Sequence, residues 1–70
     1  MRKIILEQRA DYWGAWMYGI EGMPEDIELP LPFGPQAPMT MVARDMHKRF
    51  PIARVYFRDN GKLGEVLFGI

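Results

Sequence analysis

The stretch that decides the fold is Tyr12-Trp13-Gly14-Ala15-Trp16-Met17-Tyr18-Gly19-Ile20. As a β-strand it would send large side chains to both faces, because strand side chains alternate with a period of two. One face would carry Tyr12, Trp16, Tyr18 and Ile20, and the other Trp13, Ala15 and Met17. A chain of 70 residues can hardly bury both faces. We therefore expect one face to pack on the core and the other to stay partly exposed or to meet a partner.

Composition narrows the class of protein. The length predicts a single small domain, residues 1–70, with a modest core. The hydrophobic fraction of 49% argues against disorder, and nine Lys+Arg balance nine Asp+Glu, so overall charge would not hold the chain on nucleic acid or anionic lipid. The apolar runs fall well short of the roughly 18 residues that suggest a membrane span. The absence of cysteine fits a cytoplasmic protein without disulfides.

The segments around the aromatic stretch predict an α+β fold with the order β-β-β-α-β-β. Strands are expected at residues 3–9, 12–20, 27–33, 52–58 and 63–70, and a helix at 39–50. Ala10-Asp11 predicts a turn between the first two strands, and Asn60-Gly61 a hairpin between the last two. The helix carries apolar residues at three- and four-residue spacing: Met39, Val42, Ala43, Met46 and Phe50. We expect one mostly antiparallel sheet with the helix packed on one face, and Ala53, Val55, Phe57, Val66, Phe68 and Ile70 facing inward.

Prolines mark the third predicted strand as an edge strand. Pro30 and Pro32 lie on the same side of a strict alternation and would remove donors from one edge. The competing interpretation is a polyproline-type recognition segment, since Pro35 and Pro38 follow closely. A blunted edge discourages unlimited strand addition, whereas the opposite sheet edge could pair with a second copy and form a homodimer.

The chain has few of the residue types that enzymes use for catalysis. The chain has no Ser or Cys, a single Thr40 and a single His47, so no nucleophile-and-base triad can be assembled. His47 precedes Lys48 and Arg49 near the helix C-terminus, where cations favour the helix dipole. Glu25, Asp26 and Glu28 are interpreted as a solvated turn, because their spacing matches no calcium loop. We expect a non-enzymatic protein with no cofactor and no metal.

Interface-forming residue types gather on the face that one helix cannot cover. Trp, Tyr, Arg and Met are enriched at protein interfaces. The predicted contact surface consists of Trp13, Trp16, Tyr18, Arg54, Tyr56 and Arg58. We expect a protein-interaction module that binds a partner protein. The alternative is a small nucleic-acid-binding module that uses Arg, Tyr and Trp on the sheet face.

The beginning of the chain resembles the opening hairpin of HicB-type antitoxins. The resemblance rests on Lys3-Ile4-Ile5-Leu6-Glu7, on Arg9-Ala10-Asp11, and on Trp13, Ala15 and Gly19 or Gly22. It extends to the order of elements, since those domains place the helix after three strands. The resemblance implies a non-catalytic domain that oligomerises and masks a small partner protein, acting as an antitoxin-like regulator or small inhibitor. It does not extend to residues 29–38, which are proline-rich here, nor to the helix sequence that follows.

Overall fold

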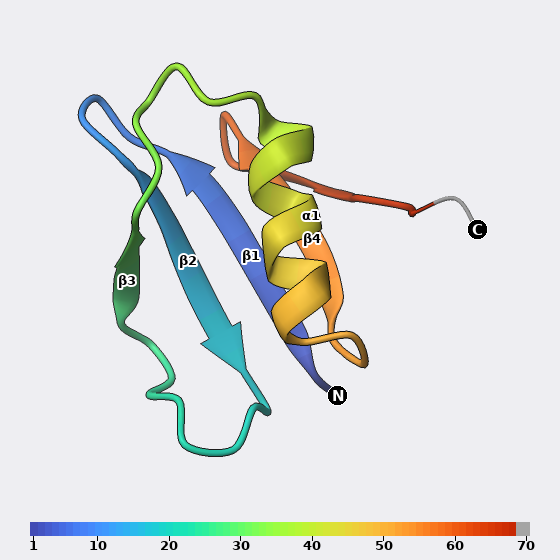
Figure 1. Ribbon diagram of the computed structural model, residues 1–70. Coiled ribbons are helices and arrows are strands. Elements are labelled where there is room, and N and C mark those ends of the chain that lie inside the picture. The colour runs from blue at the N-terminus through green and yellow to red at the C-terminus, as the bar shows by residue number, and fades with distance from the viewer. Residues whose placement is uncertain (69–70) are drawn as a thin grey trace.

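The computed structural model describes residues 1–68, which form one open sheet and one helix (Figure 1). The elements are β1 (Lys3–Gln8), β2 (Trp13–Tyr18), β3 (Glu28–Leu31), α1 (Met39–Arg49), β4 (Arg54–Asp59) and β5 (Lys62–Glu65). The strands are arranged in the order β3-β2-β1-β4-β5, and all neighbours are antiparallel except β1 and β4. The expected α+β fold, its element order and its mostly antiparallel sheet are confirmed.

The central position of β1 follows from the connections on either side of it. A tight turn joins β1 to β2, in which the Arg9 amide donates to the Tyr12 carbonyl at 2.8 Å. The chain then returns through α1 and places β4 on the other side of β1 in parallel, because parallel neighbours need a crossover connection. The β4–β5 turn holds Asn60 and Gly61 at φ of 51° and 78°. Positive φ at both positions is the geometry that the Asn-Gly pair favours.

The core lies between α1 and one face of the sheet, as Figure 1 shows. Its buried side chains are Ile4, Leu6, Trp13, Ala15, Met17, Val42, Ala43, Met46, Ala53 and Val55. Met39 and Phe50 extend the helix contribution, so the predicted apolar stripe is confirmed. Leu29, Leu31 and Phe33 pack against the same cluster. Because β3 pairs with β2 at the sheet margin, the edge-strand interpretation of the proline-rich segment is confirmed for residues 28–31.

Two expectations about the ends of strands are wrong. Ile20 packs against the core cluster rather than beside Trp16, because Gly19 adopts φ +69° and interrupts the alternation. The last strand ends at Glu65 rather than continuing, although the Val66 amide still donates to the Val55 carbonyl at 2.8 Å. Val66 and Phe68 face inward as expected. Ile70 lies outside the described residues.

Candidate interaction surface

The face of the sheet opposite α1 brings aromatic and charged side chains together. The strand registers place the following residues on it, and we call this set the open face: Lys3, Ile5, Glu7, Trp16, Tyr18, Glu28, Arg54, Tyr56, Arg58, Leu63 and Glu65. Helix α1 packs against the other face, on the side of Leu6 and Val55. Along each strand, alternate side chains thus point to the core, and the side chains between them point to the open face.

A row of side chains crosses the middle of the open face. Ile5 on β1 is directly opposite Trp16 on β2 and Tyr56 on β4. Ile5 is only 3% exposed although it points away from the core. The neighbouring side chains thus bury an aliphatic residue here, while Trp16, Tyr18 and Tyr56 themselves remain half-buried. Half-buried aromatic rings of this kind present large contact area at low cost in conformational entropy.

Glu7 links β2 and β4 across the open face. Its Oε1 accepts hydrogen bonds from the Trp16 indole N–H at 2.7 Å and from Arg58 Nη1 at 3.0 Å. The Arg58 guanidinium carbon also lies 6.0 Å from the centre of the Trp16 ring, within cation–π range. One carboxylate therefore fixes the orientation of an indole and a guanidinium together.

Glu28 forms a second anchor at the edge of the sheet. Its carboxylate accepts hydrogen bonds from Arg9 Nε at 2.6 Å and from the Tyr12 hydroxyl at 2.8 Å. The hydrogen bond to Glu28 raises the pKa of the Arg9 guanidinium, and nearby carboxylates add to this effect. The same acceptor, followed by desolvation, raises the pKa of the Tyr12 hydroxyl above its usual value.

Gly14 makes room for that carboxylate. A Cβ at position 14 would overlap the Glu28 side chain, which lies across β2 at this point. Glu28 was expected in a solvated turn with Glu25 and Asp26, and this interpretation is wrong for Glu28. It is directly opposite Trp16 in the β2–β3 ladder, and its side chain is 15% exposed. Period-two alternation with Pro30 is the signal that places it on the open face.

The structure brings together five of the six residues predicted as a contact surface. Trp16, Tyr18, Arg54, Tyr56 and Arg58 lie on the open face. Trp13 does not lie with them, and its place in that surface is a wrong prediction. It is 1% exposed, its indole N–H donates to the Ala37 carbonyl at 3.0 Å, and its ring packs against Phe57 with 5.8 Å between centroids. Trp13 is a core residue that ties the loop before α1 to the sheet.

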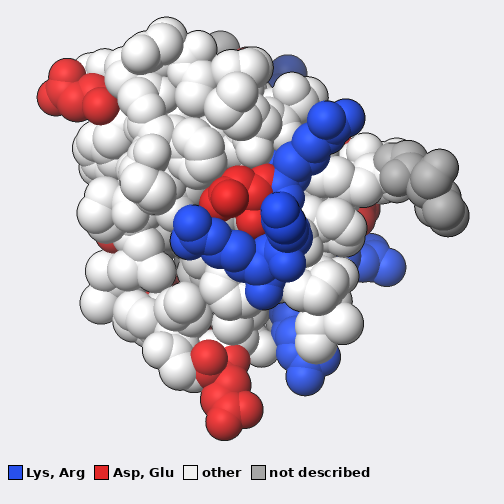
Figure 2. Space-filling model, viewed as in Figure 1, with Lys and Arg blue, Asp and Glu red and all other residues white. Residues whose placement is uncertain are grey.

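Basic residues also gather on the outer side of the helix. Figure 2, viewed with α1 towards the reader, shows Lys and Arg around a small acidic group over the helix. Arg44 and Lys48 are exposed, and Arg49 pairs with Asp45 at 3.2 Å. His47, Lys48 and Arg49 occupy the last helical turn as expected. The ring of His47 stacks on Phe68 at 4.2 Å between centroids, which makes it a packing residue.

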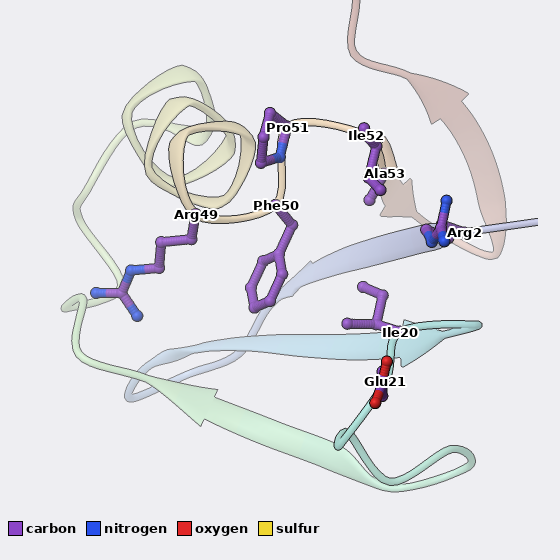
Figure 3. Close-up of a pocket in the computed structure, with 8 residues that line it drawn as sticks. All are labelled: Arg2, Ile20, Glu21, Arg49, Phe50, Pro51, Ile52 and Ala53. Atoms are coloured by element: carbon purple, nitrogen blue, oxygen red, sulfur yellow. The ribbon is translucent and has the colours of Figure 1, made fainter.

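A pocket of about 390 Å³ lies at the C-terminal end of α1, on the helix side of the sheet (Figure 3). Its floor is formed by Phe50 and Ile20, whose side chains point towards each other, while the Arg49 guanidinium points away from Ile52 and Ala53. Arg2 and Glu21 are its other charged residues. No serine, cysteine or histidine is among the residues that line it.

Comparisons with known proteins found no match: the chain matches no protein-family model, no curated protein and no solved structure. Within residues 1–68, no group of three or more His, Asp or Glu side chains is arranged to hold a metal ion. No helix in the same part of the chain is both long and apolar enough to cross a bilayer.

Proposed function

We propose that this chain is a non-catalytic interaction module that binds a partner protein through the open face, as an antitoxin-like regulator or a small inhibitor. The observation that carries the proposal is the cluster of half-buried Trp16, Tyr18 and Tyr56 beside Arg54 and Arg58. These are the residue types that dominate interface energies. The resemblance of residues 1–22 to HicB-type antitoxins supports the same class of function.

The fixed orientation of the cluster supports this proposal further. Trp16 and Arg58 share the Glu7 carboxylate, so both side chains are held before any partner arrives. Binding then costs less side-chain entropy than it would for free rotamers. A non-catalytic role agrees with a chain that has no Ser or Cys and whose one histidine is stacked on Phe68.

The test is capture of the partner with matched variants. A tagged chain is incubated with lysate of its native host, with and without nuclease, and bound proteins are identified by mass spectrometry. Trp16→Ala and Arg58→Ala are expected to lose the partner while circular dichroism stays native. Met41→Ala is the control, because Met41 is 52% exposed on the helix. Equal capture by all variants would contradict the proposal, and loss of fold in both would make these residues structural.

The alternative function is binding of single-stranded nucleic acid on the same face. Its supporting observation is the succession Arg54, Tyr56 and Arg58 along one side of β4, which could stack bases beside guanidinium groups. It predicts binding that weakens steeply with salt and disappears with nuclease. Charge neutrality of the whole chain favours the protein partner.

A homodimer and a cytoplasmic location complete the proposal. Pro30 lies within edge strand β3, whereas β5 forms the other edge with all four residues exposed. A second copy would therefore pair along β5. The cytoplasm is proposed because the chain lacks cysteine.

A further inference from the structure

Two carboxylates of the open face, Glu7 and Glu28, form two layers with the arginines paired with them, Arg58 on β4 and Arg9 just after β1. Glu65 at the β5 edge is exposed and lies outside this arrangement. Side-chain exposure is 16% for Glu7 and 15% for Glu28, but 40% for Arg9 and 31% for Arg58. The carboxylates therefore lie closer to the sheet and the guanidinium groups lie above them. Each acid is already occupied by donors of this chain, Glu7 by Trp16 and Arg58 and Glu28 by Arg9 and Tyr12.

The arginines keep donors for a partner. A guanidinium carries five N–H groups in a planar fork, and the only side-chain hydrogen bond of Arg58 within residues 1–68 runs from Nη1 to Glu7. Arg54 is exposed, and its side chain has no ion pair in the described part of the chain. Lys3 lies 5.2 Å from the centre of the Tyr18 ring and likewise has no ion pair there. Beside the exposed Glu65 at the β5 edge, the open face thus presents cationic and aromatic groups outward.

The spacing of Arg54 and Arg58 along β4 sets the spacing that two negative charges of a partner would need. Arg54 and Arg58 are four residues apart on one side of the strand, which is about 13 Å at the usual rise. Tyr56 lies midway between them. An extended segment lying along β4 repeats the same spacing, so its side chains four residues apart would reach the two guanidinium groups.

We propose that the open face binds an acidic, strand-like segment of the partner protein, with carboxylates over Arg54 and Arg58 and an apolar side chain between them over Tyr56. This inference rests on the proposed function and names the chemistry of the partner. Glu7, Glu28 and the exposed Glu65 share the face, so two separated charges match it better than a polyanion charged at every residue.

The experiment uses a peptide with blocked termini that carries two glutamates four residues apart and a leucine midway between them. The matched control peptide carries glutamines in place of the two glutamates. Binding is followed by ¹H–¹⁵N NMR through the two indole N–H signals. Trp16 reports on the open face, and Trp13, hydrogen-bonded to Ala37 in the core, is the internal control. The glutamate peptide is expected to shift the Trp16 signal and leave the Trp13 signal unchanged.

Arg54→Gln is expected to weaken this binding about fivefold, as the loss of a surface ion pair would. Arg44→Gln removes the same charge from the exposed side of the helix and is expected to leave binding unchanged.

Four results would overturn the inference. Equal binding of the glutamine peptide would show that the charge layer is not used. Absence of any shift with the glutamate peptide at millimolar concentration would show that no acidic segment of this spacing is accepted. Tighter binding of oligothymidylate at the same ionic strength would assign the cations to phosphate. Partner capture that depends on Trp16 but not on Arg54 would contradict the binding of an acidic segment, while the proposed protein-binding function would still hold.

Discussion

Trp13 and Trp16 belong to the same strand, yet their indole N–H groups donate on opposite faces of the sheet. Trp13 donates to the Ala37 carbonyl at 3.0 Å inside the core, and Trp16 donates to Glu7 at 2.7 Å on the open face. An offset of three residues reverses the direction of the side chain in a strand. The two residues therefore separate the stability of this protein from its proposed binding.

Replacing each tryptophan with alanine should show this separation. Trp13→Ala is expected to lower the free energy of unfolding by about 3–5 kcal/mol, since it removes a fully buried aromatic side chain. That is a large part of the total stability of a small domain. Trp16→Ala is expected to cost about 1 kcal/mol, because its ring is half-buried. Urea denaturation followed by circular dichroism measures both, and equal losses would contradict the assignment of the two faces.

The hydroxyl of Tyr12 should titrate at higher pH than an ordinary tyrosine. Its hydrogen bond to Glu28 raises the pKa because ionisation would remove the donor and place two negative charges side by side. Since the folded pKa exceeds the unfolded value, this contribution to stability is complete below about pH 10 and is lost as pH rises through the folded pKa. The difference in ultraviolet titration between the wild-type chain and Tyr12→Phe isolates this group. A midpoint at or below pH 10 would refute the hydrogen-bonded geometry.

Gly14→Ala should destabilise the protein, although alanine normally improves a strand position. The added methyl group would displace the Glu28 carboxylate and break its bonds with Arg9 and Tyr12. We expect a net loss of about 1 kcal/mol, small because the ion pair is partly exposed. Gly64→Ala is the matched control, since a Cβ at that strand position meets nothing within 4 Å. If both variants were equally stable, Glu28 would not be held over Gly14.

The β5 edge should control self-association. The Val66 amide points to β4, so by alternation the amides of Leu63 and Glu65 point outward. Leu63→Pro removes one outward-pointing amide donor and keeps the amides of β5 that point to β4. Sedimentation at rising concentration is expected to show a dimer for the wild-type chain and for Leu63→Ala, and a monomer for Leu63→Pro. A wild-type chain that stays monomeric at millimolar concentration would contradict the proposed dimer.

Much of the fold could be predicted because the decisive signals are local. The Asn60-Gly61 pair predicted its hairpin, and the apolar spacing of α1 predicted which side of the helix is buried. The parallel pairing of β1 with β4 could not be predicted, because the two strands are separated by most of the chain and no short motif marks their contact. Ile20 was misplaced for a local reason, since the positive φ of Gly19 ends the alternation.

The candidate surface was predicted less completely than the fold. Alternation alone assigned Trp16 and Tyr18 to one face, but it could not tell which face the helix would cover, and Trp13 was therefore included wrongly. The roles of Glu7 and Glu28 depend on the lateral order of β3, β2, β1 and β4. That order follows from tertiary pairing, so the shared carboxylates appear only in the folded structure.

The most direct test of the open face as a protein-binding surface is site-specific photo-crosslinking in the native host. A photoreactive phenylalanine analogue is placed at Tyr56 on the open face, or at Met41 on the helix as the control, and crosslinked products are identified after nuclease treatment. We predict a discrete protein adduct from position 56 and none from position 41. A protein adduct from position 41 alone, or a nucleic-acid adduct alone from position 56, would contradict the account.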